Sequence, residues 1–219
     1  MQDLSQKIQE YYFDSFDALN QDLQSKLKCN VHADLSPGTM TAIAIIYLVW
    51  SGFGRNTISF IRKSSLLEKK NTIYDPVERV YRVIPQQAMD FLRAYAESSV
   101  YMGLSNKSPY LVRSRMSMQL SYSGVTNAIS NFNMRYCRRS KPYILSYIYE
   151  SGAFCRAAEA VQNGVELPVY HKNYALTDAG MGVYEQVFGR KFSGKDVLTR
   201  YLKRFGAYCE CFKNENPPS

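Results

Sequence analysis

The chain has 219 residues, of which 46% are hydrophobic and 21% are charged. This composition excludes an intrinsically disordered chain, and the length suffices for one sizeable domain or two small ones. A net charge of +8 favours an acidic partner, with nucleic acid as the first candidate.

The charge is unevenly distributed along the chain. Residues 1–25 contain five acids and one base, whereas residues 26–70 contain seven bases and two acids. The sign of the local charge therefore reverses near residue 26. A segment that binds DNA is expected after this point rather than before it.

Membrane and secretory features are not predicted. The longest apolar run, Met40 to Trp50, is too short to cross a bilayer, and the polar, acidic start of the chain does not resemble a secretory signal. Five irregularly spaced cysteines indicate free thiols in a reducing compartment. We therefore expect a cytoplasmic protein without a membrane partner.

Two elements are predicted before residue 36. Residues 3–27 carry apolar side chains at three- and four-residue steps, which predicts an amphipathic helix with an acidic outer face. We expect this helix to pack on the rest of the protein. Residues 28–35 alternate between polar and apolar side chains, which predicts one short, half-buried β-strand.

A helix hairpin is predicted to follow the strand. Ser36 is a favourable N-cap and Pro37 suits the first helical position, so a helix should run from about residue 38 to 51. Gly52 and Gly54 are expected to end it, because glycine readily adopts the left-handed conformation after a helix. A second helix is predicted from Asn56 to Lys70.

The order of strand, helix, Gly-Arg-Asn-Thr turn and helix resembles the ribbon-helix-helix family of bacterial and plasmid DNA-binding proteins. The resemblance covers residues 27–72, about a fifth of the chain. It implies that two chains pair their strands into a ribbon that enters the major groove. The helix at 38–51 is apolar nearly all round, and a symmetric dimer would bury it.

The resemblance also implies the roles of individual residues. The outward residues of the strand would contact base edges: Lys28, Asn30 and His32. Phosphate contacts would come from the turn and the second helix: Gly54, Arg55, Asn56, Thr57, Arg62 and Lys63. Asp34 departs from this pattern, because a carboxylate facing DNA is repelled by phosphate. The alternative interpretation is an ordinary helix hairpin behind an edge strand.

The remaining chain is predicted to be mostly helical. A strand at Val77–Ile84 precedes a helix at 86–102. This order repeats the strand–helix plan, but with poorer alternation, so a second ribbon-helix-helix at 77–122 is an open alternative rather than a prediction. Further helices are predicted at 110–122, 125–138, 142–150, 153–163, 177–188 and 194–212. The fold class is thus mainly α with one short N-terminal β-strand. The predicted divisions are an N-terminal helix at 1–26, the ribbon-helix-helix unit at 27–72 and a helical C-terminal domain at 73–219.

A second candidate for base reading lies in this C-terminal domain. Residues 123–133 resemble the turn and recognition helix of a helix-turn-helix protein, which would place base reading at about 110–141. Further candidate DNA contacts are Arg113, Arg115, Arg135, Arg138, Arg139 and Lys141. A solvated helix end explains the last four equally well.

No catalytic, metal or cofactor site is predicted. The two histidines, His32 and His171, lie far apart in sequence, and the pair Cys209 and Cys211 lacks the usual spacing of a metal knuckle. The chain contains no glycine-rich phosphate-binding loop. The protein is therefore not expected to be an enzyme.

These features predict a sequence-specific DNA-binding transcriptional regulator, an activator of bacterial plasmid or mobile-element genes. The expected partners are double-stranded DNA and a second copy of the chain, as a homodimer or higher oligomer. The C-terminal domain would serve dimer stability, extra DNA contacts or contact with RNA polymerase. The alternative is an accessory or structural protein that holds DNA without reading its sequence.

Overall fold

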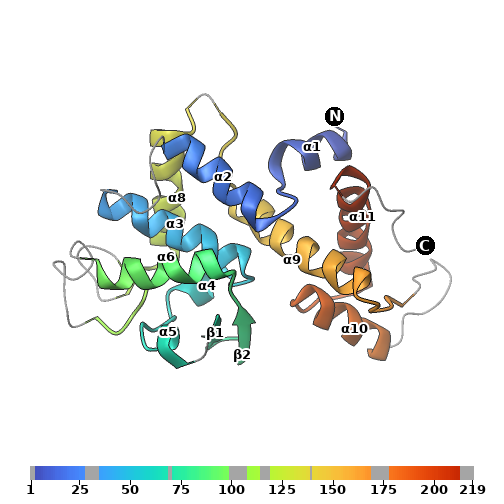
Figure 1. The fold of residues 1–219 in the computed structure, drawn as a ribbon. Helices are drawn as coiled ribbons and strands as arrows, with labels where there is room; N and C mark the ends of the chain where they lie inside the picture. Colours follow the sequence, from blue (N-terminus) through green and yellow to red (C-terminus); the bar gives the residue numbers. More distant parts are fainter. Residues whose placement is uncertain are drawn as a thin grey trace. The chain divides into compact units, whose positions relative to one another are not determined.

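The computed structural model describes residues 3–27, 35–68, 71–98, 108–113, 119–138, 140–168 and 178–212. Contacts divide the chain into two compact units, residues 16–149 and residues 1–15 with 150–219. The described part is mainly helical with a small two-stranded antiparallel sheet (Figure 1). This confirms the predicted mainly-α class. The predicted strand at 28–35 lies, except for Leu35, outside the described residues.

The unit of residues 16–149 holds most of the elements. They are α2 Phe16–Leu27, α3 Pro37–Trp50, α4 Arg55–Ile58, α5 Ser65–Glu68, β1 Thr72–Asp75, β2 Val80–Val83, α6 Gln86–Glu97 and α8 Tyr122–Tyr136. Helix α9, Leu145–Gln162, has its first residues in this unit and the rest in the other. The second unit also contains α1 Leu4–Tyr11, α10 Asp178–Phe188 and α11 Lys195–Phe212.

Helix α3 begins as its sequence predicts. Ser36 is the N-cap, and its Oγ accepts a hydrogen bond from the Thr39 N–H at 3.4 Å. Gly52 follows the helix with a φ of 95°, so its predicted left-handed conformation is confirmed. The prediction for Gly54 was wrong, because that residue has a φ of −69° and precedes α4 as its N-cap.

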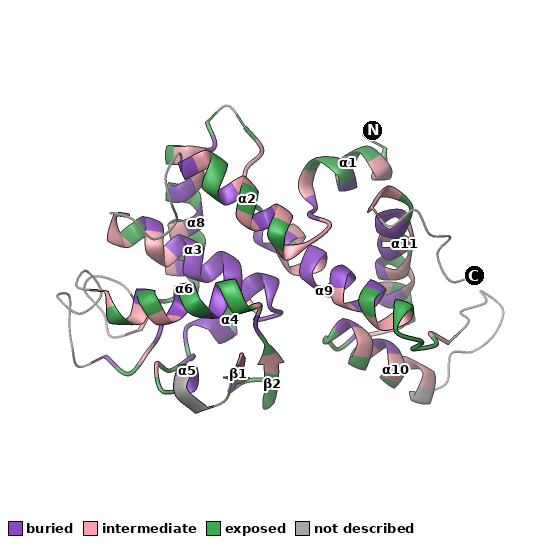
Figure 2. Ribbon diagram, in the orientation of Figure 1, coloured by how far each residue is buried: buried purple, intermediate pink, exposed green. Residues whose placement is uncertain are grey.

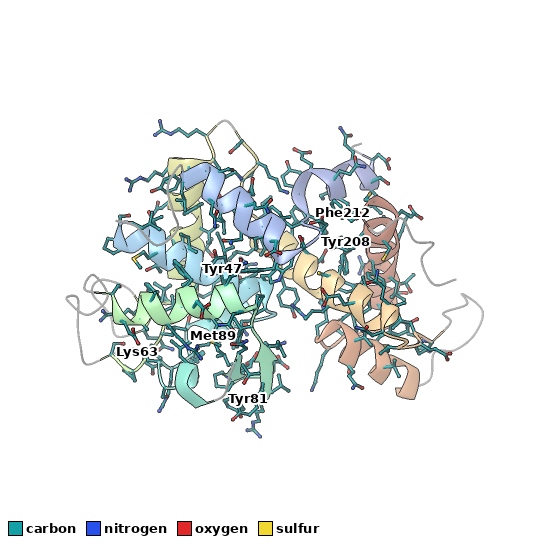
Figure 3. The ribbon with its side chains drawn as sticks, viewed as in Figure 1. Tyr47, Lys63, Tyr81, Met89, Tyr208 and Phe212 are labelled. Carbon is teal, nitrogen blue, oxygen red and sulfur yellow. The ribbon has the colours of Figure 1, made fainter. Side chains whose placement is uncertain are left out.

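Helix α3 is the core of the first unit, and every residue from Ala42 to Trp50 is buried (Figure 2). Its partners include α6 and α8. The Tyr47 hydroxyl, labelled in Figure 3, donates to Asn20 Oδ1 of α2 at 2.6 Å, and its ring centroid lies 5.3 Å from that of Phe91 in α6. One chain therefore buries this helix, so the helix no longer argues for a dimer.

The predicted second helix at 56–70 was wrong. Within the described residues 56–68, only the single turns α4 and α5 form, and the chain between them pairs with a distant segment. The Leu111 N–H donates to the Ile61 carbonyl at 2.8 Å, and the Lys63 N–H donates to the Pro109 carbonyl at 2.9 Å. Because these backbone groups are used between segments, they are not available for a continuous helix. The helix expected from the ribbon-helix-helix resemblance is therefore interrupted.

The helix predicted at 110–122 was also wrong over its described residues. Residues 110–113 and 119–121 are not helical, and Tyr110 forms an isolated antiparallel bridge with Arg62. The first helix of the predicted helix-turn-helix is thus absent from the described part of this segment. Helix α8 itself forms close to the predicted 125–138.

The strand predicted at 77–84 is the second half of a hairpin. Strands β1 and β2 pair antiparallel around a turn that the buried Asp75 carboxylate stabilises. Its Oδ1 accepts from the N–H groups of Val77 and Glu78 at 3.1 and 3.0 Å, and its Oδ2 accepts from Arg82 Nε at 2.8 Å. Since β2 pairs within its own chain, the structure does not support the alternative of a second ribbon-helix-helix copy at 77–122.

The predicted N-terminal helix at 3–27 is broken at residues 12–15. There the Phe13 N–H donates to Ser151 Oγ at 3.1 Å, and the Tyr208 hydroxyl donates to the Phe13 carbonyl at 3.1 Å. The predicted break between helices 142–150 and 153–163 does not occur, because α9 continues through the buried Ser151 and Gly152. In both places tertiary contacts override a local preference of about 1 kcal/mol or less per residue.

Candidate nucleic-acid interface

Several predicted DNA contacts lie outside the described residues. These are the three base contacts Lys28, Asn30 and His32, together with Arg115 and Arg139. The described candidates come from the turn at α4, from residues 62–63, from Arg113 and from α8 with the segment that follows it.

The predicted phosphate-binding turn keeps two accessible side chains. Arg55 and Asn56 are exposed at the start of α4, with Gly54 as N-cap. Thr57 is only 2% exposed, and its N–H already donates to the Gly54 carbonyl at 3.0 Å, so its predicted phosphate contact was wrong. Because α4 is a single turn, it has no developed helix dipole for an anion.

Two further predictions change with the structure. Arg62 is exposed and Lys63 is half-buried, but both lie on the backbone bridge to residues 109–111 rather than on a helix. Arg113 is only 6% exposed, which excludes it as a surface phosphate contact. Arg113 instead lines a pocket beside α3 and α8.

Helix α8 presents an exposed polar face. Ser121 caps the helix, and its Oγ accepts from the Gly124 N–H at 3.1 Å. The exposed side chains of this face are Ser123, Thr126, Asn127, Ser130, Asn131 and Met134. The helix contains no aspartate or glutamate. We refer to the six exposed residues as the α8 face. Its hydrogen-bonding groups are amides and hydroxyls, which can donate to and accept from base edges.

Arginines flank the α8 face at both ends. The Arg55 guanidinium carbon lies 5.2 Å from the ring centroid of Tyr122 at the start of the helix. Arg135 and Arg138 are exposed at its end, where Arg138 Nε donates to the Met134 carbonyl at 2.9 Å. The structure thus brings a predicted phosphate contact together with the helix that the sequence indicates as the second candidate for base reading.

The other side of α8 is anchored in the first unit. Val125, Ile129 and Phe132 are buried. The Asn133 side chain donates through Nδ2 to the Tyr143 carbonyl and accepts the Tyr143 N–H at Oδ1, both at 2.9 Å. A helix held in this way presents its exposed face in a defined orientation, as base reading requires.

The anchor extends from Tyr143 to helix α2. The Tyr143 hydroxyl donates to Asp22 Oδ2 at 2.6 Å, and Lys26 Nζ donates to the same oxygen at 2.8 Å. Lys26 Nζ also donates to the backbone carbonyl of Lys141 at 2.8 Å. Lys141, a predicted DNA contact, is half-buried, and its backbone is part of the anchor. Burial and the nearby Asp22 carboxylate raise the pKa of Tyr143 far above its ordinary value of 10.0.

This shift predicts a pH effect on stability. Above about pH 10 an unfolded chain loses the Tyr143 proton while the folded chain keeps it, so the free energy of unfolding falls as pH rises. Tyr143→Phe should remove up to about 1.4 kcal/mol per pH unit from that slope. It should also cost about 1.5–3 kcal/mol at pH 7 through the lost bond to Asp22. Urea unfolding followed by fluorescence of Trp50, the single tryptophan, measures both. If the free energy of unfolding of the wild type and of Tyr143→Phe fell equally with pH above about pH 10, the raised pKa of Tyr143 would be contradicted.

Within the described residues, no three histidine, cysteine, aspartate or glutamate side chains gather as a metal site. The same part of the chain includes no helix long and apolar enough to cross a membrane. Comparison of the chain with protein-family models, with curated proteins and with solved structures gave no match.

Proposed function

We propose that the protein is a sequence-specific DNA-binding transcriptional regulator that reads base edges in the major groove with the α8 face. The observation that supports this proposal is an exposed helix face rich in amides and hydroxyls, free of acids, with arginines at both ends. The net charge of +8 would attract DNA before any specific contact forms.

The residue types on this face suit base reading. Asparagine can bind the N6 and N7 groups of adenine in a bidentate manner, and Asn127 and Asn131 are one helical turn apart. The hydroxyl of Ser130 can donate or accept, and the exposed Met134 offers an apolar contact for a thymine methyl group. The major groove is wide enough to admit an α-helix.

The flanking arginines would hold the phosphates on either side of the groove. Each phosphate contact that is lost reduces the slope of log K against log salt concentration by about 0.9. We therefore expect Arg55→Gln and Arg138→Gln each to weaken binding to all DNA and to lower this slope by about that amount. Titrations at several salt concentrations measure the slope. Arg200→Gln, an exposed arginine in α11, is the matched control and should leave the slope unchanged.

A single helix contacts only a few base pairs, so we expect two copies to act together on a repeated site. In dimeric regulators the two half-sites are usually about 10 base pairs apart, one turn of the double helix. The proposed dimer would then appear in the DNA sequence as an inverted or direct repeat.

Selection of bound DNA from a random pool tests the proposal. Full-length wild-type protein, Asn127→Ala and Asn30→Ala are compared. We expect the wild type to enrich a repeated motif. Asn127→Ala should lose about 1–3 kcal/mol of discrimination at one position of each half-site, whereas Asn30→Ala should retain the motif.

The other outcomes separate the alternatives. Loss of preference in Asn30→Ala alone would move base reading to residues 28–34, as the ribbon-helix-helix resemblance implies. No enrichment by the wild type, with binding that disappears as salt rises, would contradict sequence-specific regulation and favour a DNA-holding accessory protein.

A further inference from the structure

A pocket of about 520 Å³ lies in the first unit between the start of α3 and the side of α8. Pockets for small molecules typically have volumes of about 300–1,000 Å³. The first turn of α3 forms one wall, and Arg113 and Leu120 contribute from the segment before α8. The volume is therefore in the range for a small organic ligand.

The lining combines cationic side chains, which suit an anion, with apolar side chains. Two arginines, Arg113 and Arg135, line it, and no described lining residue is a carboxylate. Arg113 is only 6% exposed, so its guanidinium lies inside the protein rather than on the surface. Arginine can bind a carboxylate or phosphate through two parallel N–H donors. Leu120 and Phe132 supply apolar surface.

The start of α3 adds to the positive potential of the pocket. It is a helix of 14 residues, and its N-terminus carries a partial positive charge. Gly38 in this first turn would have nothing within 4 Å of an added Cβ, so space is open in front of the backbone. The partial positive charge of the helix end thus adds to the attraction that the two arginines exert on an anion.

We infer that this pocket binds a small organic anion, with a carboxylate or phosphate group on Arg113 and Arg135 and an apolar body on Leu120 and Phe132. Asn127 and Asn131 belong both to the pocket wall and to the α8 face. A bound anion therefore contacts residues proposed to read DNA. This link to DNA binding rests on the proposed function, whereas the anion site does not.

Isothermal titration of the full-length protein tests the site with four probes: inorganic phosphate, phenyl phosphate, benzoate and the neutral benzyl alcohol. We expect saturable binding of phenyl phosphate or benzoate, and weaker or undetectable binding of inorganic phosphate and benzyl alcohol. Arg113→Gln should weaken anion binding, raising the Kd by about tenfold or more, because the change removes a charged bidentate donor. Arg62→Gln, an exposed arginine outside the pocket, is the matched control and should bind normally.

A second variant keeps the test valid if Arg113→Gln fails to fold. Ala128→Leu fills the pocket from α8 without removing a charge, and it should also abolish anion binding. Failure of every anionic probe to bind the wild type would overturn the inference. Equal binding by the wild type and Ala128→Leu would overturn it as well.

DNA binding provides the last comparison. If the pocket is an effector site, phenyl phosphate or benzoate changes the Kd of wild-type protein for DNA and leaves that of Ala128→Leu unchanged. If the pocket instead holds a phosphate of DNA, Arg113→Gln lowers the salt slope by about 0.9 and free anions simply compete, which would overturn the inference. Anion binding without any DNA binding would contradict the proposed function while leaving the anion site intact.

Discussion

Replacing Ser123, Asn127 and Ser130 together by alanine should abolish sequence preference while leaving non-specific DNA binding in place. Specific complexes are typically about 10³- to 10⁷-fold tighter than non-specific ones, and base contacts on one helix account for much of this ratio. The triple variant should therefore bind its selected site and random DNA with similar affinity. Competition between the two DNAs measures the ratio directly.

The variant is not expected to lose its fold. All three side chains are exposed, and alanine has the highest helix propensity, so α8 should be at least as stable as in the wild type. Three exposed polar residues of α2 provide the matched control, Gln21→Ala/Gln24→Ala/Ser25→Ala, which should retain full preference. A triple variant of α8 that still prefers the selected site would exclude this face as the reader.

Phe154→Ala should destabilise the second unit by about 3–5 kcal/mol, because it leaves a cavity in an aromatic core. Phe154 is fully buried on α9. Its ring centroid lies 4.9–6.0 Å from four neighbouring rings, those of Tyr12, Tyr201, Phe205 and Tyr208. Far-UV circular dichroism during urea unfolding measures the loss.

The cavity would also disturb the contact that orders the N-terminal segment. Tyr208, which packs on Phe154, donates its hydroxyl to the carbonyls of Phe13 and Asp14 at 3.1 and 3.2 Å. Phe60→Ala is the control, since that side chain is 49% exposed and should cost less than about 0.5 kcal/mol. Similar losses in the two variants would show that Phe154 is not the centre of this core.

Local signals in the sequence determined where three of the described helices, α3, α10 and α11, begin and end. Ser36 and Pro37 start α3, and Gly52 ends it with the left-handed φ that glycine favours. Helices α10 and α11 begin within one residue of their predicted starts at 177 and 194 and end at the predicted residues. These features depend on neighbours within one or two turns, so the sequence alone contains the information.

Only the tertiary structure decided the candidate interface. The prediction placed Thr57 and Arg113 on DNA, but packing buries both. The acid-free composition of residues 122–136 and its polar residues at three- and four-residue steps were visible in the sequence. Their exposure was not, because it depends on which side of the helix packs against distant residues such as Tyr143.

The interruption of the predicted helix after α4 also depends on residues that are distant in the sequence. Local periodicity predicted one helix at 56–70, and nothing near it in the chain argues otherwise. Residues 109–111 supply hydrogen bonds to Ile61 and Lys63, and those bonds stabilise the interruption. Spacing and caps therefore specify local structure, whereas long-range backbone pairing and burial, which no short window contains, specify which residues remain accessible to a partner.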